Sequence, residues 1–372
     1  MRGSFSLGKI LGIPIQLHMS WFLVAILVTW SLASGYFPQE YSGWSTTAYW
    51  VVGAVAAVLF FASVLLHELG HSALALREKV PVKSITLFIF GGVAQIGREP
   101  PAAGAEFRIA IAGPLTSLGL AAIFGGLGAL TAGQATVAAP LAYVGRINLL
   151  LALFNLIPGF PLDGGRVLRA VLWGLGGNFR TATQWASRAG RIVAALFILA
   201  GVFQIVLGGS FLNGLWIAFI GWFLYNAATS SYQQVVLRDA LAGVKARNVM
   251  TAQCTTVPGD LRLDRLVEDH LLGQGQRCVF IADRDDLQGL VTLHNIRNVA
   301  ADRRGEVTAI QVMTPVDSVY QVHPDDDLMT VLQRMDESDV NQVPVVDNGH
   351  LVGLITRENL LHDIRLRAEL AV

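Results

Sequence analysis

Charge is scarce in this sequence, since only 15% of its 372 residues are Asp, Glu, Lys or Arg while 53% are hydrophobic. Together with a mean hydropathy of +0.51, this scarcity is atypical of a soluble enzyme and indicates a membrane protein. The charges that are present cluster toward the C-terminal end. We therefore predict a transmembrane domain at 1–231, a linker at 232–247 and a soluble domain from residue 248 onward.

The sequence also has no net charge and contains only two cysteines. The formal net charge is zero and no Lys- or Arg-rich block stands out, so we expect no nucleic-acid partner. Cys254 and Cys278 have neither the CxxC spacing of a zinc site nor the density of a secreted disulfide scaffold, and we interpret them as reduced thiols. No small-residue cleavage site follows the first apolar run, which favours a retained span over a removed signal peptide.

Six apolar stretches are long enough to cross a bilayer, which takes about 20 residues per helix. The fourth contains Arg146, Asn148 and Asn155, which should face protein or water because polar groups are costly in lipid. The six stretches are Leu17–Ser34, Ala48–Leu76, Phe107–Ala132, Ala139–Pro158, Ala186–Leu207 and Phe211–Ser230.

Positive charge is distributed unevenly over the connections between these spans. The loops on one side, at 35–47, 131–138 and 208–209, contain no Lys or Arg. Because cytosolic loops carry the excess of positive charge, we expect a multi-pass protein of the cell membrane with both termini cytosolic. The opposite side holds Arg2, Lys9, Arg77, Lys79, Lys83, Arg98, Arg166, Arg169, Arg180 and Lys245.

Two stretches between the spans have a different pattern. Val80–Ile96 is β-branched and aromatic, is interrupted by Gly91-Gly92 and is too short to cross and return as helices, so it predicts a pair of strands. Strand edges cannot face lipid, so protein or a wet cavity must cover this pair. Phe160–Arg180 is Gly-rich and basic and is predicted to be a cytosolic connection. The predicted fold is therefore a membrane all-α domain of six helices with a small β segment, followed by a soluble α/β domain.

A candidate metal site ends the second predicted span, in His67-Glu68-Leu69-Gly70-His71. Residues four apart share one face of a helix, so His67 and His71 can hold one zinc ion while Glu68 reaches the metal-bound water as general base. Solvated charges are the alternative interpretation. Three ionisable side chains in one turn of an apolar span would be costly without a function, which favours the metal site.

The third ligand is predicted to be Asp163, in Asn155-Leu156-Ile157-Pro158-Gly159-Phe160-Pro161-Leu162-Asp163-Gly164-Gly165-Arg166. The second and fourth predicted spans run in the same direction, so His71 and Asp163 should both emerge near the cytosolic face. The alternative is an ordinary turn aspartate, since Asp-Gly is a common turn signal. The two prolines should break the helix and present Asp163 from unwound backbone.

The pairing of HELGH with NLIPGFPLDGGR resembles the site-2 protease family of intramembrane metalloproteases, peptidase family M50. The resemblance covers about residues 1–230 and includes FGGV at 90–93 and Ala112-Gly113-Pro114, read as a turn of the third span. It implies that the two histidines and Asp163 bind one zinc ion and that Glu68 is the catalytic base.

The same resemblance implies a single-span membrane protein as substrate, often an anti-sigma factor or similar regulator, cut in regulated intramembrane proteolysis. It also implies that the strand segment near Phe90–Ala94 pairs with an unwound substrate by β-augmentation. By analogy with other hydrolases, Asn155 is a candidate donor to the developing oxyanion, with an interhelical hydrogen bond as the alternative. His18, Arg146 and Asn148 are interpreted as structural.

The soluble part contains an internal repeat. Each copy combines short β-branched strands with an amphipathic helix, at Leu261–Leu272 and Asp327–Met335. The pattern resembles a tandem pair of CBS domains, at 248–303 and 304–372. The repeated segments are Val249-Met250-Thr251 with Val312-Met313-Thr314, Pro258 with Pro324, and Gly289-Leu290-Val291-Thr292 with Gly353-Leu354-Ile355-Thr356.

CBS pairs often bind adenine nucleotides, with an acidic residue after the Gly-x-x-Thr strand holding the ribose. Asn295 and Asn359 occupy these positions here, and an amide lacks the two charged acceptors of a carboxylate. Thr292 and Thr356 stay candidate contacts. We predict a regulatory or dimerisation module. Adenine nucleotide binding stays open against a purely structural role or the formation of a homodimer.

Two rival functions remain beside intramembrane proteolysis. In a CBS-gated membrane cation transporter, the same histidines and aspartate would bind the transported ion. In a membrane-tethered metalloprotease, they would serve the hydrolysis of soluble peptides.

Overall fold

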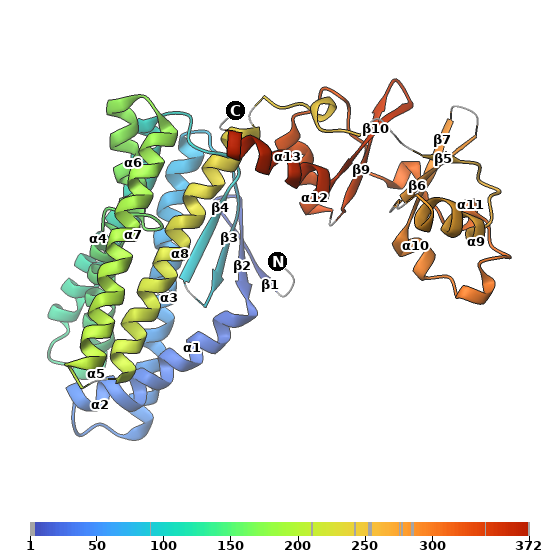
Figure 1. The fold of residues 1–372 in the computed structure, drawn as a ribbon. Coiled ribbons are helices and arrows are strands. Elements are labelled where there is room, and N and C mark those ends of the chain that lie inside the picture. Colours follow the sequence, from blue (N-terminus) through green and yellow to red (C-terminus); the bar gives the residue numbers. More distant parts are fainter. Residues whose placement is uncertain are drawn as a thin grey trace. The chain divides into compact units, whose positions relative to one another are not determined.

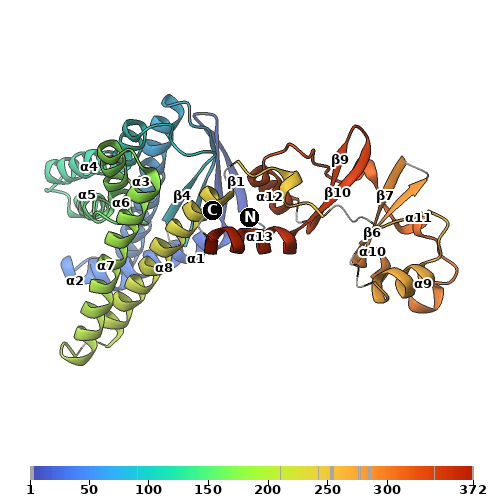
Figure 2. The same cartoon turned by 45° about the horizontal axis from the view of Figure 1, so that its top comes forward.

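The computed structural model describes residues 4–89, 91–209, 211–241, 243–251, 255–274, 276, 278–283, 286–338 and 340–370. The chain divides into two compact units, residues 1–233 and 234–372. Figure 1 and Figure 2 show each unit from two directions. Phe90 and Cys254 lie outside the described residues, whereas Cys278 is buried.

In the described part of the first unit, six helices are long and apolar enough to cross a membrane. Each coincides with one of the six predicted spans. A short π-helical turn at Leu32–Tyr36 joins α1 to α2. α1, this turn and α2 together form the first of the six, and α6 is not one of them. The helical elements of the unit are α1 (Met19–Ser31), α2 (Phe37–Glu40), α3 (Thr46–Arg77), α4 (Ala103–Leu130), α5 (Ala135–Asn155), α6 (Asp163–Gly176), α7 (Phe179–Val206) and α8 (Phe211–Leu241).

A four-stranded sheet accompanies these helices, in the order β1-β2-β3-β4. The predicted strand pair is confirmed as β3 (Val82–Phe88) and β4 (Gly91–Ile96), which are antiparallel. The other two strands, β1 (Ser4–Ile10) and β2 (Ile13–His18), were not predicted. β2 joins β3 in parallel, and the sheet packs on α3 through a small apolar core that includes Leu69.

Two segments are more regular than the sequence indicated. The predicted connection Phe160–Arg180 contains the amphipathic helix α6, which is not among the described helices that are long and apolar enough to span a membrane. Ala112-Gly113-Pro114 lies in the third span, as predicted, and forms part of the continuous helix α4. Proline is tolerated in such a helix because neighbouring helices and local adjustments satisfy the backbone groups that it frees.

The second unit is built from two similar α/β halves. The segment predicted as a linker is helical up to Leu241, and Leu241, Val244 and Ala246 are buried in the core of the second half. The elements are β5 (Thr256–Val257), α9 (Leu263–Arg265) extended by a π-helical turn (Leu266–Leu272), β6 (Cys278–Asp283), β7 (Asp286–Thr292), α10 (Leu293–Arg297), α11 (Ala309–Val312), β8 (Thr314–Pro315), α12 (Leu328–Glu337), β9 (Gln342–Asp347), β10 (His350–Thr356) and α13 (Arg357–Leu370).

The two halves exchange their opening segments. Met250 packs against Gly353 of the second half, where a Cβ would lie 2.8 Å from its sulfur. Met313 packs against Gly289 of the first half in the same way, at 2.7 Å. The repeated Val-Met-Thr and Gly-x-x-Thr segments thus contact each other across the halves, and the limits of the two CBS domains stay a prediction.

Candidate metal centre

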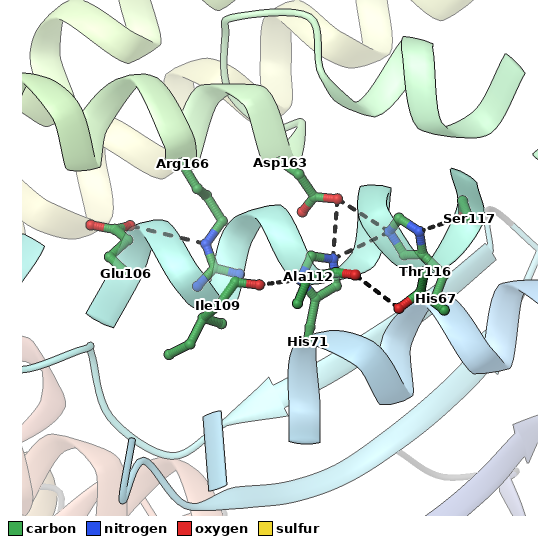
Figure 3. A network of polar contacts seen from close by, with 9 residues as sticks. All are labelled: His67, His71, Glu106, Ile109, Ala112, Thr116, Ser117, Asp163 and Arg166. Carbon is green, nitrogen blue, oxygen red and sulfur yellow. Dashed lines mark hydrogen bonds and ion pairs between the residues drawn. The ribbon is translucent and has the colours of Figure 1, made fainter. Parts of the chain in front are cut away.

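Helix α3 places two imidazoles on one face, as the spacing predicted. The side chain of Ser45 caps the start of the helix by accepting from the amide of Ala48. One turn separates His67 from His71, and their Nε2 atoms are 3.2 Å apart. Both residues are buried, with 4% and 5% exposure. Two imidazole nitrogens therefore converge on one point inside the membrane unit (Figure 3).

Asp163 meets these histidines from another helix. Its Oδ2 atom lies 3.1 Å from Nε2 of His67 and 3.1 Å from Nε2 of His71. Burial raises the pKa of Asp163, but hydrogen bonds with the two histidines lower it more, so the net shift is downward and the carboxylate stays charged. The residue predicted from its motif is thus brought to the histidine pair.

The prediction of unwound backbone at Asp163 was wrong, because this residue begins α6. A carboxylate in the first turn is favoured by the helix dipole. The two glycines that follow do not mark a turn. A Cβ at Gly164 would lie 2.4 Å from the carbonyl oxygen of Ile157, and one at Gly165 would lie 2.3 Å from the amide of Phe160. The glycines let the segment before α6 fold back on its first turn.

The three donor atoms fit a tetrahedral metal ion. Ligands at about 2.0–2.1 Å from zinc are about 3.3–3.4 Å from one another in a tetrahedron, close to the separations of 3.1 and 3.2 Å here. The far ring nitrogens are also held: Nδ1 of His71 donates to the carbonyl of Ile109 at 2.7 Å. Nδ1 of His67 pairs with Oγ of Ser117 at 2.9 Å. Such partners turn Nε2 toward the metal.

Helix α4 approaches these donors through a glycine, which has no side chain. A Cβ at Gly113 would lie 2.1 Å from Nε2 of His71 and 2.7 Å from Nε2 of His67. Gly70 permits the close packing of α3 on α4, since a Cβ there would lie 2.4 Å from Oγ1 of Thr116. Any side chain at Gly113 would therefore occupy the space that faces both nitrogens.

Glu68 lies between the metal donors and the sheet. The backbone amide of Ala94, in β4, donates a hydrogen bond to its carboxylate. A Cβ at Gly92 would lie 2.5 Å from Cγ of Glu68. Among the described strands, β4 pairs only with β3 and is the last strand of its sheet. The carboxylate therefore lies beside an edge strand whose glycine permits close approach.

A buried ion-pair network fastens α6 to α4. Glu106 is fully buried and accepts from Nε of Arg169 at 2.8 Å. The Arg169 guanidinium also lies over the rings of Phe160 and Phe179, 4.9 and 4.5 Å from their centres. Arg166, one turn after Asp163, lies 4.0 Å from the same carboxylate. This network fixes the helix that carries Asp163.

Among the described residues, no hydrogen bond joins the other polar residues singled out in the sequence to the donors. Asn155 ends α5, and among the described residues no hydrogen bond joins it to the metal donors, so its role stays a prediction. Asn148 donates to the carbonyl of Val144 in its own helix. Arg146 bonds the hydroxyl of Tyr36, and His18 caps α1.

The C-terminal unit contains a cavity of about 1210 Å³ between its two halves. Thr292, Thr356 and Asn359 line it, whereas Asn295 does not. Asn295 caps α10 by pairing with Thr292 and also bonds Thr314. Its amide is therefore used by the local structure rather than offered to the cavity.

Comparison with known proteins identifies the family. The profile of peptidase family M50 matches residues 55–134 and 130–200, and the CBS domain profile matches residues 307–366. Rip3 of Mycobacterium tuberculosis, a protein named as a zinc metalloprotease, is 40% identical over 361 residues, which cover 96% of this chain and 91% of Rip3. The chain belongs to peptidase family M50. It is therefore a metallopeptidase with a CBS domain, and membership favours this interpretation over the cation transporter.

Two further M50-related proteins extend the comparison. Zinc metalloprotease MJ0392 of Methanocaldococcus jannaschii is 30% identical over 366 residues, which cover 97% of this chain and 96% of that protein. A solved structure of a site-2 protease from Methanocaldococcus jannaschii is 30% identical and covers 62% of this chain and 95% of its own, with a TM-score of 0.43.

Several residues at the centre were missed by sequence reasoning. Ser117 and the carbonyl of Ile109 orient the imidazoles, and Glu106 and Arg169 hold α6. Serine, alanine and glycine are so common in membrane helices that a single sequence gives them no distinguishing signal. The position of Glu106 could have indicated a buried ion pair, because a carboxylate at the start of an apolar span requires a partner.

Proposed function

We propose that this chain is an intramembrane zinc metalloprotease in which His67, His71 and Asp163 bind zinc and Glu68 is the general base. The observation that carries the proposal is the convergence of three donor atoms at 3.1–3.2 Å beside a fourth ionisable side chain. The names of the relatives, which specify zinc, support the choice of metal.

Each residue has a defined task in peptide hydrolysis. Zinc, when bound, supplies the Lewis acidity that activates water and polarises the scissile carbonyl. The Glu68 carboxylate takes the proton of the attacking water and passes it to the amide nitrogen that leaves. Ser117 and the Ile109 carbonyl hold the imidazoles in the metal-binding tautomer. Asn155 is proposed as a donor to the oxyanion.

The proposed substrate is a single-span membrane protein, cut in regulated intramembrane proteolysis. A helical substrate must unwind before its carbonyl can be attacked, and an unwound segment can add to the free edge of β4 by backbone hydrogen bonds. Gly92 of β4 lies against Glu68. A strand bound there would run beside the base, which supports a peptide in extended form as substrate.

We propose a topology with both termini cytosolic and a regulatory or homodimer-forming role for the CBS pair. Adenine nucleotide is the proposed ligand of the C-terminal cavity, with Thr292 and Thr356 as hydroxyl contacts. The second half is proposed to hold the ribose, because Asn359 lines the cavity and Asn295 does not. ATP and AMP added to a cleavage assay would test this.

The test of the proposed function uses Glu68→Gln. A lost general base should lower kcat by about 10²–10⁴-fold, while one zinc per chain remains because the three ligands are untouched. Glu40→Gln, the same change at an exposed site, should cleave normally. Equal cleavage of a membrane substrate by wild type and Glu68→Gln would remove Glu68 from the mechanism.

A second assay separates intramembrane cleavage from peptidase activity on soluble chains. The wild type is given one substrate with its transmembrane segment and one without it. We expect only the membrane-inserted form to be cut, since the donors are buried within the membrane unit. Equal cleavage of both forms would support the membrane-tethered peptidase instead.

A further inference from the structure

A groove of about 630 Å³ lies where α6, α7 and α8 meet, and the proposed chemistry does not use it. α6 lines it with Leu168 and Leu172, and α8 with Tyr225. α7 contributes Trp185 and Ile192 together with Arg188 and Arg191. α7 and α8 pack tightly here, since a Cβ at Gly221 would lie 2.7 Å from the carbonyl of Ala194. The groove therefore lies between helices that are in close contact.

The charge of this groove is uncompensated. Neither an aspartate nor a glutamate lines it, and within the described residues no ion pair joins Arg188 or Arg191 to a carboxylate. Arg188 lies over the ring of Trp185, 5.0 Å from its centre. Arg169, in contrast, is fully engaged by Glu106. Two guanidinium groups on an apolar groove therefore offer their hydrogen-bond donors to a ligand.

The depth of the arginines in the bilayer suits a lipid phosphate. They follow Ala186, the first residue of the predicted span, by two and five residues, which is about 3 and 7.5 Å along a helix. Long cationic side chains at this depth reach the headgroup layer, where tryptophan and tyrosine are also enriched. Leu168, Leu172 and Ile192 continue the groove with apolar surface.

We propose that this groove binds an anionic phospholipid, with Arg188 and Arg191 on the phosphate and an acyl chain along the leucines and Ile192. Charge complementarity selects the headgroup, because a zwitterionic lipid brings its own cation to the site. The lipid contacts α6 five residues after Asp163 and thus supports the helix that carries this carboxylate. The proposal does not depend on the proposed enzymatic function.

The test compares phosphatidylglycerol with phosphatidylcholine of identical chains, added to the protein purified in a neutral detergent. Native mass spectrometry measures retained lipid and thermal unfolding measures stabilisation. We expect wild type to prefer phosphatidylglycerol. In Arg188→Gln with Arg191→Gln, binding of phosphatidylglycerol should weaken roughly 30-fold, at about 1 kcal/mol for each arginine. Binding of phosphatidylcholine should not change.

Two controls make the result decisive. Arg188→Lys with Arg191→Lys should keep most of the preference, because the charge remains. Arg77→Gln with Lys79→Gln removes two charges from the same predicted side outside the groove and should keep the preference in full. The proposal is overturned if the glutamine pair retains the wild-type preference, if the Arg77 and Lys79 control loses it equally, or if inorganic phosphate alone stabilises wild type as well as the lipid does.

Discussion

The two units of this protein differ in which side chains they bury and which they expose. In the membrane unit, Leu199 and Phe203 are 64% and 63% exposed, whereas Glu106 and Asn148 are 0% exposed. In the C-terminal unit, Val279 and Leu328 are 0% exposed, and the charged residues lie mostly at the surface. Apolar exposure carries no penalty in lipid, so the C-terminal unit depends more on an apolar core for its stability than the membrane unit does.

The difference shows where function is encoded in each unit. Buried polar side chains in the membrane unit are costly unless they are paired or bind a ligand, and several of them, among them His67, His71 and Ser117, lie at the candidate metal centre. In the C-terminal unit the candidate ligand contacts Thr292, Thr356 and Asn359 line a cavity. Substitutions that act on one unit and spare the other test this division.

The largest effect is expected from Gly113→Ala. The new methyl group would lie 2.1 Å from Nε2 of His71, so the imidazoles must move and zinc should be lost with all cleavage activity. Gly119→Ala, on the same helix, meets nothing within 4 Å and should behave as wild type. Zinc content by elemental analysis checks both. Full zinc occupancy in Gly113→Ala would contradict the donor geometry described here.

A large effect confined to the other unit is expected from Leu328→Ala. This side chain is fully buried in the core of the second half, so its truncation should lower the free energy of unfolding of the C-terminal unit by about 2–5 kcal/mol. Leu199→Ala, at an exposed position, should change stability by less than about 0.5 kcal/mol. Denaturant unfolding measures both changes, and zinc content should be normal in each. Equal destabilisation by the two variants would erase the contrast between the units.

A smaller effect within the metal centre is expected from Ser117→Ala. Its hydroxyl holds Nδ1 of His67 at 2.9 Å, and loss of such a partner weakens metal binding by about 10–100-fold. Ser63→Ala removes a buried hydroxyl that bonds only its own helix, at the carbonyl of Leu59, and should leave the affinity unchanged. Competition with a chelator gives the affinities. An unchanged affinity in Ser117→Ala would remove this residue from the centre.

Patterns with a fixed local period could be read from the sequence. The four-residue interval between His67 and His71 fixes a shared helix face, and the apolar run lengths fix the spans. β2 could also have been predicted from the sequence, since Ile13, Ile15 and Leu17 are buried and alternate with less buried residues. Its period-two pattern was overlooked because a long apolar run follows directly.

Contacts between distant segments could not be derived in this way. Ser117 reaches His67 across 50 positions, and Arg169 reaches Glu106 across 63. Such pairs depend on which helix faces lie together, and nearly every face of a membrane helix is apolar. The proximity of Asp163 to the histidines was predictable because a sequence motif surrounds it and because the second and fourth spans run in the same direction. Its place at the start of a helix was not predicted.

The most direct test of the central claim is zinc-edge X-ray absorption on purified Glu68→Gln, measured beside Asp163→Ala. We predict one zinc per chain in Glu68→Gln, bound by two imidazole nitrogens and by oxygen at about 2.0–2.2 Å, and loss of one protein oxygen ligand together with most of the metal in Asp163→Ala. An absence of stoichiometric zinc from intact, unchelated protein, or an identical zinc environment in both variants, would contradict the assignment of His67, His71 and Asp163.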